Sequence, residues 1–269
     1  MKALGKISKY FEIGKISYLN NSAYFIGTIS RGFTVFFRIW IFTALYRTTL
    51  NAYGLETINN LSLANVIWTL MIVQAFGSST RPNIESLIQD EIKDGTFAYT
   101  INKPYSYFKF NLARSFGNIF SNILPNILIG SIAAMILVGP IQITFIGLML
   151  GLILMLFGFI LDFLISFIIG ICAFWMEDIT PLTWIHGKST MVFGGMILPI
   201  SLFPDKIQKI AELLPFSQLF YAPSKVITSG NFSDFIHYLP IQLIWISVAG
   251  LISYAVFKKG VRNVSQNGG

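Results

Sequence analysis

The sequence predicts an all-α integral membrane protein with six transmembrane helices, and three observations carry that prediction. Hydrophobic residues make up 54% of the 269 residues and charged residues only 12%, against roughly 25% charged residues in an average soluble domain. The mean hydropathy is +0.66. Apolar stretches of about 20 residues, the length that a helix needs to cross a bilayer, recur along the chain. We therefore expect a single membrane domain over residues 1–269.

The first expected element is a short amphipathic helix over residues 1–20, lying on the inner leaflet. Apolar Leu4, Ile7, Phe11 and Ile13 are interleaved there with lysines, a pattern typical of interfacial helices. A disordered basic tail is the alternative. Because the segment lacks the apolar core of a secretory signal, we interpret it as mature sequence.

Six segments are expected to span the membrane: 24–48, 61–80, 116–138, 142–174, 184–203 and 235–257. The fourth is longer than one crossing requires, yet it contains neither Pro nor a polar turn. We therefore expect it to form one long or tilted helix. An even number of spans places both termini on the same side of the membrane.

Basic residues indicate which side that is. With the termini inside, the outer segments hold only Arg47, Lys206, Lys209 and Lys225. The inner segments hold Lys2, Lys6, Lys9, Lys15, Arg81, Lys93, Lys103, Lys109, Arg114, Lys188, Lys258, Lys259 and Arg262. Such an excess predicts cytoplasmic termini. Topology and anionic lipids then account for the net charge of +7, so we expect membrane lipids, and no nucleic acid, as partners.

Cysteine and histidine are too few for several kinds of site. Cys172 is the only cysteine, which excludes a disulfide within the chain. His186 and His237 lie far apart in the sequence, so no metal site of His and Cys ligands is expected.

The inner segment 81–115 carries the most charge for its length. Ile84, Leu87, Ile88 and Ile92 follow a helical period within it, and Gly95 and Pro104 come after them. The stripe predicts a short amphipathic helix. Such a helix can dock in a groove on a soluble partner or rest on the membrane surface, and periodicity does not separate the two.

Arg38 and Asp162 lie well inside predicted spans. A charge at the centre of a membrane helix costs roughly 2.5–3.5 kcal/mol on insertion scales, which makes it a candidate functional residue. The two residues can pair with each other or line a path through the membrane. We favour a structural ion pair or hydrogen bond between helices.

The outer segment 204–233 is broken by Pro204, Pro215 and Pro223 into pieces too short to span. Ile207, Ile210, Ala211 and Leu214 form a helical stripe in it. A surface loop without a mechanistic role is one interpretation of this segment.

The fragment "WIHGKST" resembles the end of a phosphate-binding loop at Gly187-Lys188-Ser189. Such a loop requires an earlier glycine after a β-strand, and Leu182 occupies the position of that glycine. We therefore exclude nucleotide binding here. The predicted topology places Gly187 and Lys188 in the second cytoplasmic loop, as a secondary partner contact or an inner-side anchor.

Two stretches resemble the permease subunits of ABC-2-type exporters. The first is "EIKDGTFAYTINKPYSY" (Glu91 to Tyr107), which is similar to an acid-Ile-x-x-Gly element followed by Leu/Ile-x-Arg/Lys-Pro-Tyr. The second is "LFPDKIQKIAELLPFSQLFYAPSKVITSG", similar to the successive Phe-Pro, Leu-Pro-Phe and Tyr-x-Pro elements of that family. The resemblance covers nearly the whole chain. Its closest branch is the one of paired permeases linked to drug, antibiotic or viologen efflux.

The resemblance implies an ABC-2 (type V exporter) fold in a prokaryotic-type cell membrane. It also implies two copies of a separate ATP-binding subunit and a second permease, identical or related. ATP and Mg²⁺ would bind to the ATPase, with no cofactor on this chain. The cargo would be an amphipathic or hydrophobic compound (drug, antibiotic, peptide or lipid-like) that is exported by alternating access.

The family's motifs also imply roles for individual residues. Coupling to the ATPase falls to Ile88 and Ile92 as an apolar plug, Glu91 as a hydrogen-bond or ion-pair partner, and Gly95 as the turn that ends the helix. Segment 204–233 would dip back into the outer leaflet, with Pro215, Phe216, Tyr221 and Pro223 as an outer gate. Tyr105, Tyr107, Phe108 and Lys109 match the start of the next helix, although an aromatic belt alone explains them.

Three other classes of function compete with the exporter. An ion-coupled secondary transporter more often carries several intramembrane acids, whereas only Asp162 lies clearly at mid-membrane here. An intramembrane enzyme would need a catalytic cluster, and none stands at a plausible spacing, so the chain is not expected to be an enzyme. A non-transporting membrane assembly protein stays open as an alternative.

Overall fold

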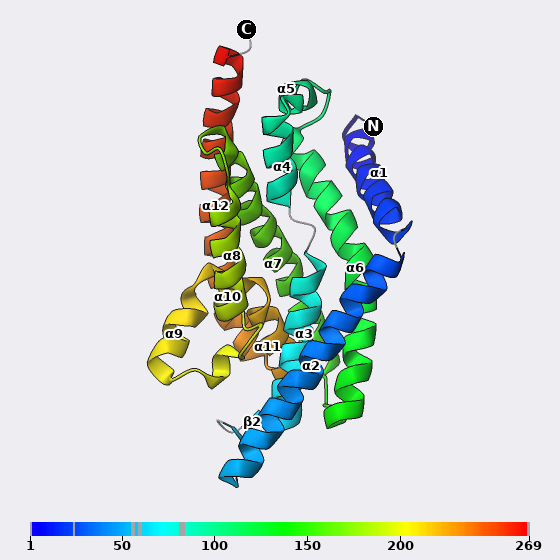
Figure 1. Ribbon diagram of the computed structural model, residues 1–269, viewed down its shortest axis with the longest axis vertical. Helices are drawn as coiled ribbons and strands as arrows, with labels where there is room; N and C mark the ends of the chain where they lie inside the picture. The colour runs from blue at the N-terminus through cyan, green and yellow to red at the C-terminus, as the bar shows by residue number, and fades with distance from the viewer. Residues whose placement is uncertain (1, 24, 55–56, 59–60, 81–83, 268–269) are drawn as a thin grey trace.

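The computed structural model describes residues 2–23, 25–54, 57–58, 61–80 and 84–267. The long helices run roughly along the longest axis of the molecule (Figure 1). By the length and composition of the described residues, four segments are long and apolar enough to cross a membrane: one that begins at Leu63, and Tyr107–Val138, Phe145–Phe174 and Phe232–Arg262. These segments agree with an all-α membrane protein, while the expected total of six spans stays a prediction.

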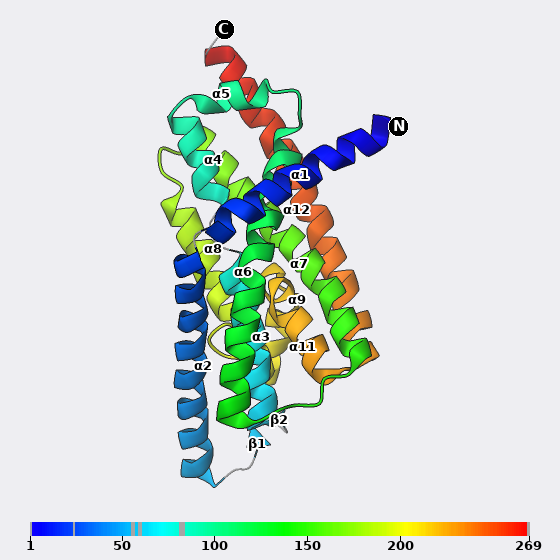
Figure 2. The same ribbon diagram turned by 90° about the vertical axis from the view of Figure 1, so that its right-hand side faces the viewer.

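The N-terminal third of the chain contains α1 (Lys2–Ala23) and α2 (Phe25–Tyr53). A small antiparallel hairpin follows, made of β1 (Thr57–Ile58) and β2 (Leu61–Ser62). The helix expected over 1–20 is therefore present, and it lies obliquely across α6 (Figure 2). Its position at a membrane surface stays a prediction, and so does a crossing by α2, which is not among the four segments above.

Helices α3 (Leu63–Ser79), α6 (Tyr107–Val138) and α7 (Phe145–Ile171) form the centre of the molecule. Side-chain oxygens start all three, because Ser62, Ser106 and Thr144 each accept a hydrogen bond from a backbone N–H in the first turn. On α3, Ile67 and Leu70 are fully buried in the main apolar core. The helix α7 continues without a break into η1 (Cys172–Phe174), which confirms a single long helix over the fourth expected span.

A short helical hairpin lies at one end of the molecule, formed by α4 (Ile84–Lys93) and α5 (Thr96–Ile101). The start of α1 and the end of α12 (Phe232–Asn267) lie toward the same end (Figures 1 and 2). This arrangement agrees with an even number of crossings. That this end faces the cytoplasm stays a prediction.

The expected span over 184–203 is wrong as a single helix. Instead, α8 (Thr180–Phe193) ends after 14 residues and the chain continues to η2 (Ile200–Leu202). A helix of that length reaches only about 21 Å, shorter than an apolar core of about 30 Å. The positive φ of 78° at Gly195 redirects the chain beyond α8.

The expected short pieces in the outer segment are present as α9 (Asp205–Leu213), α10 (Pro215–Leu219) and α11 (Tyr221–Ser229). Pro204 precedes α9, and Pro215 occupies the first turn of α10, where a missing N–H costs nothing. All three helices lie farther from the α4–α5 hairpin than the middle of the molecule, between it and the end where β2 lies (Figure 1).

Candidate functional site

The turn between α4 and α5 is built as the sequence predicts. Gly95 has a φ of 73°, a left-handed conformation that is costly for residues with a Cβ. The N–H of Gly95 donates to the carbonyl of Ile92 at 3.3 Å, and that of Asp94 donates to Asp90 at 2.8 Å. Gly95 therefore ends the helix, which confirms its role as a turn.

The apolar stripe of α4 faces the chain's own helices. Ile88 is 1% exposed and belongs to an apolar cluster with Phe167 and Ile171 of α7. Its seat is Gly170, where a methyl group would lie 2.9 Å from Ile88 Cβ and 3.1 Å from Glu85 Cα. The expected apolar plug at Ile88 is therefore wrong, because α7 already occupies that side chain. A coupling role for α4 stays a prediction.

Glu91 connects α4 to α6. Its Oε2 accepts a hydrogen bond of 2.7 Å from the hydroxyl of Tyr107, and the Tyr107 ring stacks on Phe257 of α12 with centroids 6.0 Å apart. Tyr107 is only 3% exposed, so the aromatic-belt interpretation is wrong for this residue. Helix α4 is thus joined to three long helices at once.

The exposed side of the hairpin is polar. Asp90 and Lys93 are exposed on α4, Asp94 is exposed directly after it, and Tyr99 of α5 is 71% exposed. A soluble partner would meet this polar face, since the apolar stripe is covered.

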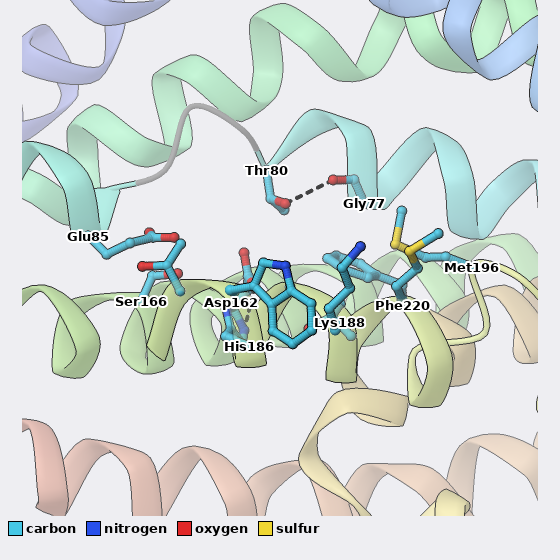
Figure 3. Close-up of a pocket in the computed structure, with 14 residues that line it drawn as sticks. Gly77, Thr80, Glu85, Asp162, Ser166, His186, Lys188, Met196 and Phe220 are labelled. Atoms are coloured by element: carbon cyan, nitrogen blue, oxygen red, sulfur yellow. Dashed lines mark hydrogen bonds and ion pairs between the residues drawn. The ribbon is translucent and has the colours of Figure 1, made fainter. Parts of the chain in front are cut away.

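A cavity of about 320 Å³ lies beside this assembly, bounded by α3, α4, α7 and α8. Figure 3 shows Glu85 of α4 next to Ser166 at one end, Asp162 and His186 at the centre, and Met196 and Phe220 at the other end. The cavity therefore has a polar end close to the hairpin and an apolar end away from it.

Asp162 and His186 form the central pair of the cavity wall. The distance from Asp162 Oδ1 to His186 Nε2 is 3.6 Å, and the two side chains are 14% and 11% exposed. The His186 ring also lies 6.2 Å from the ring of Phe216 on α10. Phe216, one of the predicted gate residues, therefore lies beside His186, which in turn pairs with Asp162.

Arg38 is placed near a neighbouring cavity of about 160 Å³. One of its guanidinium nitrogens donates to Gln74 Oε1 at 2.8 Å, and the amide of Gln74 donates to the Met196 carbonyl. Met191 and Met196 line both cavities. A hydrogen bond between helices is thus confirmed for Arg38, while a direct pair with Asp162 stays a prediction.

Gly187 and Lys188 lie inside α8 and line the larger cavity. Their expected place in a cytoplasmic loop is therefore wrong. His186 is a residue of this cavity that the sequence did not predict as a site residue. Its only signal in the sequence is its position three residues after Thr183, which puts both on one face of α8.

The four predicted gate residues are packed against the interior. Tyr221 is fully buried, and Pro223 is buried with its carbonyl 3.0 Å from where a methyl group on Gly151 would lie. Phe216 is half-buried, and Pro215 begins α10. A gate role for these residues stays a prediction.

Comparison with curated proteins finds no significant match. The family described as "ABC-2 family transporter protein" matches residues 30–268, nearly the whole chain. This match confirms the resemblance carried by the two motifs, though not the drug or antibiotic branch. The chain belongs to the ABC-2 family of transporters and is an ABC-2-type permease.

Proposed function

We propose that this chain is the permease subunit of an ATP-driven exporter, and that α4 receives the movement of a separate ATP-binding subunit. The observation that carries the proposal is the seating of α4 on α7. Ile88 packs directly over Gly170, where there is no side chain to keep the two helices apart. Displacement of α4 would therefore be passed to a helix that fits a membrane crossing.

Two further contacts make that transfer rigid. The 2.7 Å hydrogen bond between Glu91 and Tyr107 holds α4 to α6, and Phe257 of α12 stacks on the same tyrosine. A partner that presses on exposed Asp90, Lys93 or Asp94 would therefore move α6, α7 and α12 as one unit.

The proposed assembly contains two permeases, identical or related, and two ATPase copies that bind ATP and Mg²⁺. Closure of the ATPases would open a path between the permeases toward the outside of the cell membrane. The many exposed apolar side chains of α2, including Phe37, Trp40 and Ile41, are available for lipid or for the second permease. An amphipathic or hydrophobic cargo would suit a path lined by such apolar side chains.

The proposal is tested by separating α4 from α7 with one methyl group. Gly170→Ala would force Ile88 away from its seat, whereas Gly250→Ala on α12 meets open space and serves as the matched control. In the complex with its ATPase, we expect Gly170→Ala to weaken the coupling by about 1 kcal/mol, a severalfold change. The measurement is the ATPase rate of the reconstituted complex relative to the free ATPase subunit.

Replacements on α4 itself complete the test. Glu91→Gln weakens the hydrogen bond to Tyr107, and Ile92→Ala removes part of the apolar packing. If both variants and Gly170→Ala kept wild-type complex formation and ATP-dependent transport, α4 would not be the coupling element.

A further inference from the structure

A groove of about 360 Å³ lies where α1 crosses α6, and the oblique crossing is visible in Figure 2. The two helices come closest at two glycines. A methyl group on Gly14 would lie 3.2 Å from the carbonyl oxygen of Ala113, and one on Gly117 would lie 2.9 Å from Ser17 Cβ. Because helices that cross at an angle diverge beyond their closest contact, larger side chains there enclose a groove.

Hydrogen bonds on both sides of the crossing fix α1 in place. Before it, Lys9 Nζ donates to the carbonyl of Pro104 at 2.9 Å. After it, Asn21 Nδ2 donates to Asn122 Oδ1 of α6 at 3.0 Å. The groove therefore lies between two anchored points of α1 and is already formed in this structure.

Aromatic side chains make up most of the lining. They come from both helices: Tyr10, Phe11 and Tyr18 of α1, and Phe116 and Phe120 of α6. The hydroxyl of Tyr10 already accepts a hydrogen bond of 3.1 Å from the backbone N–H of Ser106. Phe11 is 71% exposed. Because exposed aromatic surface is unfavourable in water, the groove suits a hydrocarbon occupant.

The groove continues into the apolar surface of a long helix. After Phe120, the side chains of Leu124, Leu128 and Ile132 follow at intervals of four residues, and each is more than half exposed. They belong to Tyr107–Val138, which is long and apolar enough to cross a membrane. Lipid hydrocarbon that covers this stripe can therefore extend into the groove along apolar surface throughout.

Basic residues dominate the surroundings of the groove. Lys15 lies in its lining, and Lys109 is exposed on α6 one turn before Ala113. Glu12 is the only acidic residue in the sequences of α1, α2 and α6, which pack together here. Glu12 is exposed and forms no ion pair with Lys15 among the residues that the structure describes. An anionic group is therefore favoured beside Lys15.

We infer that the groove between α1 and α6 binds an anionic phospholipid, with an acyl chain along Phe116 and Phe120 and the phosphate at Lys15. Each part of the site matches one part of such a lipid. A soluble phosphate compound would leave the aromatic lining uncovered, and a neutral hydrocarbon would make no use of the lysine. The inference goes beyond the proposed function, because this lipid is a bound component of the permease and its binding requires no ATPase.

The test measures lipid binding to the full-length permease alone by native mass spectrometry in detergent. The probes are dioleoyl phosphatidylglycerol and dioleoyl phosphatidylcholine, which have the same acyl chains and differ in net charge. Phosphatidylglycerol should bind at least about fivefold more tightly, the factor expected from one lysine near an anionic lipid. Lys15→Gln should remove that preference.

Lys258→Gln is the matched control for charge. It removes a lysine from an exposed position of α12, toward the same end of the molecule as the start of α1 (Figures 1 and 2), and should keep the preference for phosphatidylglycerol. Equal affinity of the wild type for the two lipids would overturn the inference. So would the same loss of preference in Lys258→Gln as in Lys15→Gln.

A second pair of variants tests the apolar part of the site. Phe120→Ala removes a ring from the groove wall and should weaken phosphatidylglycerol binding severalfold. Leu128→Ala, farther along the same exposed stripe, is the matched control and should bind as the wild type does. Unchanged binding in Phe120→Ala would contradict the inference. Displacement of the lipid by soluble glycerol phosphate would also contradict it, since the anion alone would then occupy the site.

Discussion

The neighbours of α7 differ in how closely they approach it. Toward α10 and α11, Gly147, Gly151 and Gly158 bring backbone against backbone: a methyl group on Gly147 would lie 2.7 Å from Gly230 Cα, and one on Gly158 would overlap the Leu219 carbonyl. Toward α8, the helices line a cavity of about 320 Å³, and Asp162 and His186 approach to 3.6 Å in its wall.

This difference indicates which parts of the molecule move together. Packed interfaces without gaps change only in discrete steps, so α4, α7 and α11 are expected to behave as one body. Helix α8 carries the exposed side chains of Trp184 and Ile185 and is held to α7 by fewer close contacts. A motion that changes the cavity would therefore occur between α7 and α8.

The largest expected effect on stability comes from adding one methyl group to a glycine, either at the close contact of α7 with α10 or on α8. Gly158→Ala must displace the α10 backbone and should destabilise the protein by about 1–3 kcal/mol. Gly187→Ala on α8 meets nothing within 4 Å and should stabilise the helix by up to about 1 kcal/mol. Unfolding in detergent measures both, and effects of the same sign and size would refute the difference.

A smaller effect is expected from the buried amide that joins α12 to the closely packed side. Gln242 is fully buried and its amide donates to the carbonyls of Leu154 and Gln218 at 2.9 and 2.8 Å. Gln242→Leu leaves both carbonyls with one partner fewer and should cost about 1 kcal/mol, because carbonyls tolerate the loss of a partner better than N–H groups do.

The matched control is Gln208→Leu on α9. Gln208 donates a hydrogen bond of 3.0 Å to Glu212 one turn away. Such a contact contributes only about 0.3 kcal/mol. Equal destabilisation by the two replacements would show that burial of Gln242 contributes nothing.

The smallest effect concerns the start of α8. Asp178 Oδ1 accepts hydrogen bonds from the backbone N–H and the hydroxyl of Thr180, at 3.0 and 2.7 Å. These bonds lower the pKa of Asp178 below 3.8. The stabilisation is therefore complete well above pH 3.8 and is lost as pH falls through the lowered pKa of the folded protein.

Asp178→Ala should accordingly increase hydrogen exchange in the first turn of α8 at neutral pH. The difference from the wild type should shrink at pH values below the pKa of the folded protein. Asp205→Ala, at an exposed helix start without such bonds to its side chain among the described contacts, provides the comparison. A difference that grows as pH falls would contradict this account of Asp178.

Much of the fold follows from local patterns in the sequence. Hydrophobic length predicts the helices that became α3, α6, α7 and α12, and the stripe ending at Gly95 predicts α4. The helix against which the apolar stripe of α4 packs could not be predicted. Ile88 packs on Gly170 of α7, and nothing near Ile88 in the sequence indicates this contact.

The cavity was beyond sequence reasoning for a related reason. Hydropathy extends the fifth span through residue 203, whereas α8 ends at Phe193 and the chain turns at Gly195. His186, in the middle of α8, lies beside Asp162 of α7. The partner of an intramembrane acid depends on the relative height of two helices, which composition and periodicity do not fix.

Distances between helices with and without ATP test the central claim most directly. In a Cys172→Ser background, paired spin labels at exposed Leu156 of α7 and exposed Ser86 of α4 report one interface, and labels at Leu156 and Val192 of α8 report the other. When ATP is added to the complex with the ATPase, the α4–α7 distance should stay constant while the α7–α8 distance changes. A change between α4 and α7 with a constant distance between α7 and α8 would contradict the account.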